Sequence, residues 1–173
     1  MQKKKFKKTM RPNASQFPDM HACALQKLEE LNHPLIPKLY YYDDTEYECE
    51  FIEGEDLETY IRRTGDYNLA LKVVELVQDL MLQMSKTEFT YKWEYSHKNY
   101  WRLAAEDIHS KNILITKEGR PYLIDLDQIG WWHPWTIFKI MMSANIRLTD
   151  TLRYAFVHWA NDRTTEKLKA LSK

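Results

Sequence analysis

The sequence of 173 residues is long enough for one domain or for two small lobes that share a cleft, and its hydrophobic content of 44% is typical of a protein with a packed core. Lysine plus arginine number 25, as do aspartate plus glutamate, so the chain has no overall charge that would attract nucleic acid or an acidic membrane surface. The two cysteines, Cys23 and Cys49, form no C-x-x-C pair and indicate a reducing compartment or plain buried thiols.

The basic first segment, MQKKKFKK, is interpreted as a solvated strand or tail, and a phosphate or nucleic-acid role is the alternative. The residues after it lack the continuous apolar stretch of a secretory signal. The apolar segment GWWHPWTIFKIMMSANI is interrupted by His133, Pro134 and Lys139 and is shorter than the roughly 20 residues that cross a bilayer. Its three tryptophans are expected to pack in the core where a helix starts, with a membrane-surface or partner-binding patch as the alternative. We expect a cytoplasmic protein with no transmembrane segment and no nucleic-acid partner.

Hydrophobic periodicity predicts mainly strands early in the chain and mainly helices later. The expected order is strand, helix, hairpin, short helix, long helix, hairpin and final helix, at residues 3–10, 19–32, 33–54, 56–65, 68–85, 113–130 and from 136 onward. Phe6, Lys8 and Met10 share one face of the first strand, and Asp19 is the expected N-cap of the first helix. Segment 86–105, rich in aromatic and charged residues, has no clear period and is left unassigned.

Three polar residues stand in the stretch EDIHSKNILI, directly before an apolar run. They are Asp107, His109 and Asn112, and residues 113–115 follow them. A turn that leads into a buried strand needs only one or two such residues, so the D-x-H-x-x-N spacing indicates a site. Asp125 lies in the hairpin expected at residues 113–130, 13 positions after Asn112. An Asx-type turn is the alternative for Asp107 and Asn112 taken alone.

The order of elements and four segments of the sequence resemble the protein-kinase-like fold. LNHPLIPKLYYY is similar to the segment after the regulatory helix of kinases, ECEFIEGEDL to the hinge that carries adenine, DIHSKNILI to the catalytic loop, and LIDLD to the D-F-G position. His109, where eukaryotic protein kinases have lysine, and the LIDLDQ segment resemble the branch that contains aminoglycoside and choline phosphotransferases and bacterial lipopolysaccharide sugar kinases. The resemblance extends over roughly residues 3–160.

This resemblance implies an α+β protein with the two-lobed protein-kinase-like fold. The expected lobes are a truncated N-terminal β lobe at residues 1–53 and a mainly helical C-terminal lobe, with the catalytic and metal-binding loops, at residues 54–173. The resemblance also implies ATP and Mg²⁺ as cofactors and a protein or sugar hydroxyl as the acceptor of the γ-phosphoryl group.

By the same resemblance, Asp107 is the base that accepts the proton of the acceptor hydroxyl, while Asn112 and Asp125 bind Mg²⁺ through hard oxygen ligands. His109 is expected to stabilise the loop by hydrogen bonding, and Asp127 either supports the metal site or caps a turn. The backbones of Glu50 and Ile52 are expected to bind adenine, with Cys49 as the gatekeeper. The residues that the resemblance assigns to the nucleotide are Lys8, Cys49, Glu50, Phe51 and Ile52.

The sequence departs from the kinase pattern in several places. Its four glycines form no G-x-G-x-x-G loop, and Lys5 and Lys7 compete with Lys8 for the phosphate-binding role. Ala24 stands where the regulatory helix normally has its glutamate, so an acid from a shifted helix would have to replace it. The candidates are Asp19, Glu29 and Glu30. AAED stands where H-R-D or H-G-D is expected, which removes the residue that usually braces the loop.

Three hypotheses follow from this pattern. The first is a minimal ATP-dependent phosphotransferase, favoured because Asp107, Asn112 and Asp125 are all retained, with a protein partner that covers its open phosphate site. The second is a catalytically silent pseudokinase that acts as a nucleotide- or partner-binding module, which the missing glycine loop and helix glutamate support. The third is an unrelated α+β interaction domain.

Overall fold

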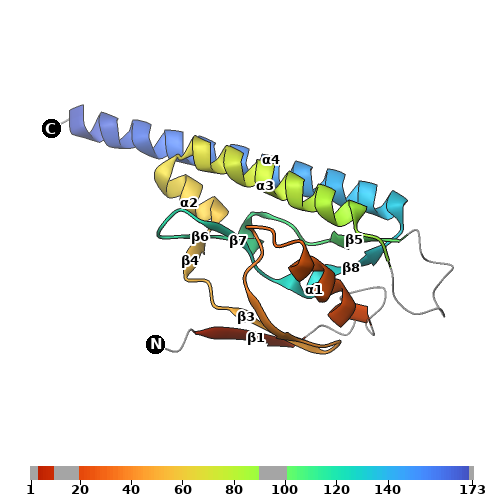
Figure 1. The fold of residues 1–173 in the computed structure, drawn as a ribbon. Helices are drawn as coiled ribbons and strands as arrows, with labels where there is room; N and C mark the ends of the chain where they lie inside the picture. The colour runs from red at the N-terminus through yellow and green to blue at the C-terminus, as the bar shows by residue number, and fades with distance from the viewer. Residues whose placement is uncertain (1–3, 10–19, 90–100, 172–173) are drawn as a thin grey trace.

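The computed structural model describes residues 4–9, 20–89 and 101–171, and it has the two-lobed α+β architecture that the sequence predicts (Figure 1). The elements of the N-terminal part are β1 (Lys5–Thr9), α1 (His21–Glu30), β2 (Leu39–Tyr42) and β3 (Glu46–Glu50). The elements that follow are β4 (Gly54–Asp56), α2 (Leu57–Thr64), α3 (Tyr67–Lys86), β5 (Arg102–Ala105), the 3-10 helix η3 (Ser110–Asn112), β6 (Ile113–Thr116), β7 (Pro121–Leu123), the 3-10 helix η4 (Leu126–Gln128), β8 (Ile129–Trp132) and α4 (Pro134–Leu171).

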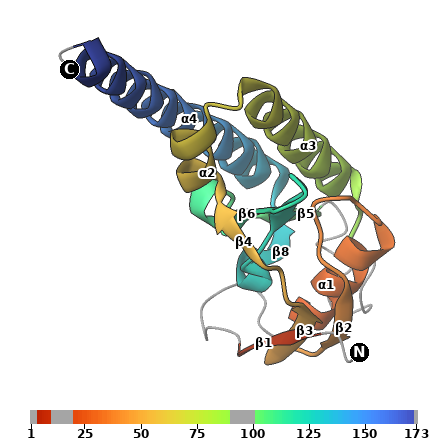
Figure 2. The same ribbon diagram turned by 90° about the vertical axis from the view of Figure 1, so that its left-hand side faces the viewer.

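The N-terminal lobe is an antiparallel sheet of strand order β1-β3-β2. Strand alternation decides its faces, since Tyr47 and Cys49 of β3 are buried while the glutamates between them are partly exposed. Helix α1 contacts β2 of this sheet and β8 of the other lobe, so it lies between the two (Figure 2). The predicted first strand is confirmed, whereas Met10 and Asp19 lie outside the described residues and Met20 occupies the N-cap position of α1.

The turn between β2 and β3 is held by one carboxylate, as expected for a polar turn. Asp43 accepts hydrogen bonds from the Tyr41 hydroxyl, from the hydroxyl and N–H of Thr45, and from the N–H of Glu46. These donors hold the pKa of Asp43 well below its usual range, because each favours the charged carboxylate. The turn of this hairpin is therefore fixed by local hydrogen bonds.

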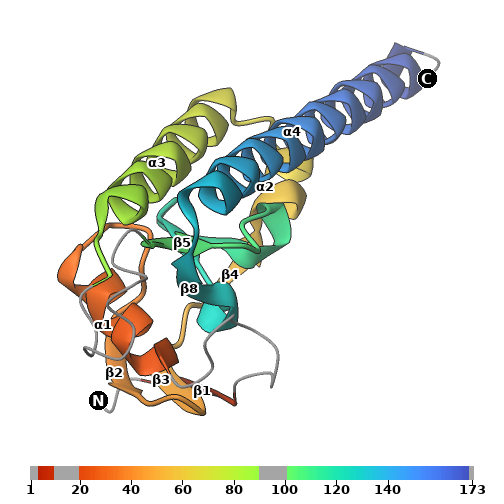
Figure 3. The ribbon, with the colours of Figure 1, turned by 90° about the vertical axis from the view of Figure 1, so that its right-hand side faces the viewer.

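The C-terminal lobe consists of three helices that cover two small sheets, of order β4-β6-β7 and β5-β8. Helices α3 and α4 lie side by side along one edge of the molecule, and the end of α4 extends beyond the other elements (Figures 1 and 3). The predicted long helix is confirmed. Its buried residues are Leu69, Ala70, Val73, Val77, Leu80, Met81 and Met84.

The three tryptophans of GWWHPW differ from the prediction. Trp131 and Trp132 are buried, but they lie in strand β8 opposite Leu103 and Arg102 of β5, a partner strand in the segment that the sequence left unassigned. Trp135 lies in the first turn of α4 and is 62% exposed. The helix begins at Pro134, two residues before the predicted start, because the fixed φ of proline suits the first position of a helix.

None of the helices in the described ranges combines the length and the apolarity that spanning a bilayer requires.

Replacing Gly65 by alanine is expected to lower the free energy of unfolding by about 2–4 kcal/mol. Gly65 ends α2 with a φ of 66°, a left-handed conformation that costs an L-residue energy, and its N–H donates to the carbonyl of Ile61 at 2.8 Å. A Cβ at this position would lie 2.2 Å from Cε2 of Trp159, on α4. Chemical denaturation of the purified variant measures the loss.

Gly119→Ala is the matched control, since Gly119 also has a positive φ, of 74°, but a Cβ there meets nothing within 4 Å. We expect a cost of only about 1 kcal/mol, from the backbone strain alone. Equal losses in the two variants would contradict the role given to the contact between α2 and α4.

Candidate active site

A pocket of about 230 Å³ lies between the two lobes, and it contains the residues that the sequence assigns to the nucleotide. Strands β1 and β3 and the linker after β3 form one side, and residues from β6 and from the segment after β7 form the other. The lining residues are Phe6, Lys8, Pro37, Tyr47, Cys49, Glu50, Phe51, Ile52, Leu114, Ile124, Asp125 and Leu126. Eight hydrophobic or aromatic side chains and one proline contribute to its walls, as is common in small-molecule sites.

Glu50 and Ile52, the two residues expected to bind adenine through their backbones, differ in the groups that they leave available for a ligand. The N–H of Glu50 donates to the carbonyl of Lys38 at 2.8 Å, and the N–H of Phe51 donates to the carbonyl of Lys4 at 3.2 Å. The N–H of Glu50 is therefore engaged within the N-terminal lobe. Among the described residues, Ile52 has no backbone hydrogen-bond partner, so its N–H and C=O are the groups left for a ligand.

Lys8 is the lysine that reaches the pocket. Its ammonium group forms an ion pair with Asp125 and lies 3.4 Å from Oδ2 of Asp127. Lys5 and Lys7 lie on the opposite face of β1, where they pair with glutamates of β3 and are more than half exposed. The pairing of β1 with β3 thus determines which of the three lysines lines the pocket.

No glutamate of α1 pairs with Lys8. Glu29 accepts from the Tyr42 hydroxyl at 3.0 Å, and Glu30 pairs with Lys27 at 2.7 Å, so neither takes the role expected of it. The third candidate, Asp19, lies outside the described residues. The second anion beside Lys8 is instead Asp127, whose side chain is 1% exposed. The sequence left the role of Asp127 open, and the ion pair with Lys8 explains why an acid is buried there.

Helix α1 contributes a histidine to the site in place of an acid. Nε2 of His21 lies 3.3 Å from the carbonyl of Leu126, and the N–H of Leu126 donates to the Tyr47 hydroxyl at 3.0 Å. Burial lowers the pKa of His21, because the apolar surroundings disfavour its charged form. Both backbone groups of Leu126 are therefore held, and with them the residues on either side, Asp125 and Asp127.

The D-x-H-x-x-N stretch forms a closed loop around η3. Nδ2 of Asn112 donates to the backbone carbonyl of Asp107 at 3.0 Å and to its carboxylate at 3.3 Å. Nδ1 of His109 accepts from the N–H of Lys111 at 3.2 Å, which caps η3 and agrees with a loop-stabilising role for this histidine. The N–H of Ile124 donates to the carbonyl of Asn112 at 2.8 Å, so the loop is joined to the residue before Asp125.

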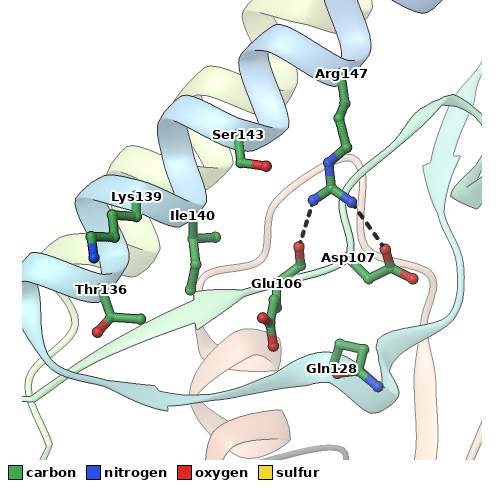
Figure 4. Close-up of a pocket in the computed structure, with 8 residues that line it drawn as sticks. All are labelled: Glu106, Asp107, Gln128, Thr136, Lys139, Ile140, Ser143 and Arg147. Carbon is green, nitrogen blue, oxygen red and sulfur yellow. Dashed lines mark hydrogen bonds and ion pairs between the residues drawn. The ribbon is translucent and has the colours of Figure 1, made fainter.

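A second pocket, of about 660 Å³, contains Asp107 (Figure 4). Its walls are the loop after β5, one residue of η4 and the first turns of α4. The lining residues are Glu106, Asp107, Gln128, Thr136, Lys139, Ile140, Ser143 and Arg147. Segment 125–128 contributes to both pockets, since Asp125 and Leu126 line the first and Gln128 lines the second.

Arg147 is a residue of this pocket that sequence reasoning missed. Nη2 of Arg147 donates to the carbonyl of Glu106 at 2.9 Å, and Nη1 lies 3.5 Å from Oδ1 of Asp107 (Figure 4). It stands on α4, 40 positions after Asp107, and no local pattern in the sequence connects the two.

The side-chain oxygens of Asp125 and Asn112 are of the kind that binds a hard cation. Within the described ranges, no group of three or more histidine, cysteine, aspartate or glutamate side chains is arranged to hold a metal ion. Asn112 is not one of these four residue types. Because its Nδ2 donates to Asp107, its amide oxygen is the atom left for a ligand. A carboxylate and an amide oxygen are ligands that Mg²⁺ accepts together with water and phosphate oxygens.

Comparisons with known proteins give a structural relative and no sequence relative. No family model matches the chain, and no curated protein is significantly similar to it. A kinase of the Cydia pomonella granulovirus, PK-1, is structurally similar, with a TM-score of 0.51 and a sequence identity of 13%. The match covers 76% of this chain and 45% of that kinase chain, so this chain spans less than half of the kinase's length. At such an identity the match shows the fold alone, and the chain has a kinase-like fold with a truncated N-terminal lobe.

Proposed function

We propose that the chain is a minimal ATP-dependent phosphotransferase that moves the γ-phosphoryl group to a hydroxyl of a protein or a sugar. The observation that carries this proposal is that residues of segment 125–128 line two pockets. One contains the hinge residues, Lys8 and Asp125, and the other contains Asp107. A nucleotide in the first and an acceptor in the second would meet at this segment, as in-line transfer requires.

In this proposal the nucleotide is held by groups from both lobes. The adenine lies against Cys49 and the backbone of Ile52, and Phe51 contacts it from the mouth of the pocket. Lys8 exchanges its ion pair with Asp125 for the phosphates, while Asp127 keeps a negative charge beside its ammonium group. Asn112 and Asp125 hold Mg²⁺, which supplies charge neutralisation of the phosphate oxygens when it is bound.

Asp107 acts as the base of the transfer. Its carboxylate accepts the proton of the acceptor hydroxyl while the hydroxyl oxygen forms a bond to the γ-phosphorus. The bond between that phosphorus and the bridging oxygen breaks, and ADP leaves with its electron pair. The protein contributes positioning and charge stabilisation, and Asp107 serves a proton transfer that needs no covalent intermediate.

The finer assignments rest on the resemblance and remain parts of the proposal. His109 and the LIDLDQ segment support a place near the small-molecule phosphotransferases and sugar kinases. We also propose the division into lobes at residues 1–53 and 54–173, a cytoplasmic location, and a protein partner over the phosphate side, since the sequence has no G-x-G-x-x-G loop to cover it.

A pseudokinase is the second candidate, and one contact favours it. Lys8 and Asp125 neutralise each other, with Asp127 as a further partner of Lys8. Such a pair stabilises the structure without nucleotide, and both residues would have to change partners before ATP and Mg²⁺ are bound. A chain that retains this pair in all conditions would bind partners rather than transfer phosphate.

Thermal unfolding with nucleotide and metal separates these candidates. A ligand that binds only the native state raises the midpoint temperature, because it stabilises that state by RT ln(1 + [L]/Kd). We expect a clear rise with ATP plus Mg²⁺, a smaller one with ATP plus EDTA, and release of phosphate or transfer to an acceptor over time. A rise without turnover supports the pseudokinase, and no rise in either condition contradicts a nucleotide site.

ATP is expected to shield Cys49 from a thiol reagent, because Cys49 lines the pocket at the end of β3. Burial raises the pKa of Cys49 to about 11, so a small reagent such as methyl methanethiolsulfonate and a pH of about 8.5 or above are needed. The measurement uses a Cys23→Ser background, which leaves Cys49 as the one thiol of the chain. Labelling at an unchanged rate under saturating ATP would argue against this hinge.

A further inference from the structure

The sequence AAED, which ends with Asp107, stands where H-R-D or H-G-D is expected. The loop that carries Asp107 therefore lacks the motif residue that usually braces it. In the structure, a cation from a distant element contacts this loop. Arg147 projects from α4 and approaches both Glu106 and Asp107 (Figure 4). The brace is therefore present in space although it is missing from the motif.

The two contacts of Arg147 act on different parts of the loop. Nη2 donates to the Glu106 carbonyl at 2.9 Å and so fixes the backbone, and Nη1 lies 3.5 Å from Oδ1 of Asp107 and so orients the carboxylate. A planar guanidinium is suited to this, because its donors have a fixed relative geometry that a lysine does not offer. One rigid group thus relates the base to the chain that carries it.

The part of helix α4 that carries Arg147 is itself held in the core. Its neighbours Ala144 and Leu148 are fully buried in the main core, and α4 packs on α2 and α3. A side chain on such a helix loses little additional freedom when it contacts the loop. The position of Asp107 is consequently tied to the core of the C-terminal lobe.

The contacts of Asp107 also leave a place for an acceptor. Oδ1 faces Arg147 at 3.5 Å and Nε2 of His109 at 3.4 Å, and Oδ2 accepts from Asn112 at 3.3 Å. An ionised carboxylate has about four lone-pair sites, so three partners leave one for the hydroxyl of an acceptor. The open side is the 660 Å³ pocket, which Arg147 also lines.

We infer that Arg147 is the positioning residue of the base: it holds the Asp107 carboxylate and the Glu106 carbonyl in the orientation that transfer requires, in place of the brace that the loop motif lacks. This inference rests on the proposed phosphotransferase function. Arg147 touches neither the nucleotide pocket nor, in this assignment, the transferred group.

The kinetic test is ATP hydrolysis, with water as the acceptor because the natural acceptor is not identified. In Arg147→Ala we expect kcat to fall about 10- to 100-fold, the cost of a misplaced catalytic group, with the KM for ATP unchanged. Added guanidinium ion should restore part of the rate in Arg147→Ala, and Arg147→Lys should retain an intermediate rate. Arg153→Ala, an exposed arginine further along α4, is the control and should behave as the parent.

The second measurement does not need activity. Hydrogen exchange of the backbone amides at residues 106–112 should be about tenfold faster in Arg147→Ala than in the parent or in Arg153→Ala, because the Glu106 carbonyl loses its donor. Unchanged exchange at these amides overturns the inference, even if the parent is inactive. If the parent binds no nucleotide and hydrolyses none, the proposed function fails while the exchange result still decides the role of Arg147.

Two kinetic outcomes would also overturn the inference while the proposed function stands. One is an unchanged kcat in Arg147→Ala. The other is a loss of kcat that guanidinium does not restore and that is accompanied by a higher KM and a lower unfolding temperature. This pattern would indicate general damage to α4 and not a displaced Asp107.

Discussion

Asp125→Asn is expected to weaken the Mg²⁺-dependent affinity for ATP by about 100-fold or more, equivalent to about 2.7 kcal/mol of binding free energy. The substitution takes a formal charge from the proposed metal site and from the partner of Lys8, with almost no change in volume. The fold should survive, because Asp125 has a φ of 63° and asparagine tolerates this left-handed conformation well. Calorimetric titration with ATP, with and without Mg²⁺, measures the effect.

The control for this prediction is Asp150→Asn, which removes the same charge from an exposed position on α4. ATP affinity in this variant should equal that of the parent. Full Mg²⁺-dependent affinity in Asp125→Asn would count decisively against the metal assignment. If affinity falls equally in the presence and absence of Mg²⁺, the role of Asp125 would be to place Lys8 and not to bind the ion.

The parts of the site that lie close together in the sequence could be predicted from it. Asp107, His109 and Asn112 belong to one short loop, and the apolar run after them pairs as β6 with β4 and β7. The burial of Cys49, in the segment proposed as the hinge, follows from alternation along β3, and the strand ends at the next residue, Glu50. Local pattern and local structure coincide at these residues.

The choice among the N-terminal lysines needed the sheet itself. Alternation shows that Lys5 and Lys7 share a face and that Lys8 lies on the other, but it does not show which face is inward. That is decided by the pairing with β3, where Lys8 stands opposite the buried Tyr47 and Lys7 opposite Glu48. A single pairing register therefore turns an ambiguous basic run into one pocket residue and two surface ion pairs.

The remaining elements depend on contacts between distant segments, which leave no local signature. Trp131 is buried by the pairing of β8 with β5, so its environment is set by residues far earlier in the chain. Arg147 reaches the loop of Asp107 because α4 packs on α2 and α3. Asp127 pairs with a lysine of β1 in the opposite lobe. In each case a generic local pattern acquires its role from tertiary packing.

Asp107→Asn is expected to lower the rate of transfer by about 10² to 10⁴, the usual contribution of a general base, with ATP affinity within twofold of the parent. An amide oxygen can still face Arg147, but an amide accepts no proton from the acceptor hydroxyl at neutral pH. The affinity should persist because Asp107 lies in the second pocket and contributes nothing to the lining of the first.

Single-turnover transfer and equilibrium ATP binding, measured on the same preparation, test the two halves of this prediction. Asp107→Asn and Asp125→Asn should give opposite patterns, with chemistry lost in one and binding lost in the other, because the two carboxylates line different pockets. A loss of ATP affinity in Asp107→Asn as large as that in Asp125→Asn would mean that the roles of the two acids have been confused. Unchanged turnover would show that the proton leaves the acceptor without Asp107, and the base would have to be sought elsewhere on the wall of the acceptor pocket, where Glu106 is the neighbouring carboxylate.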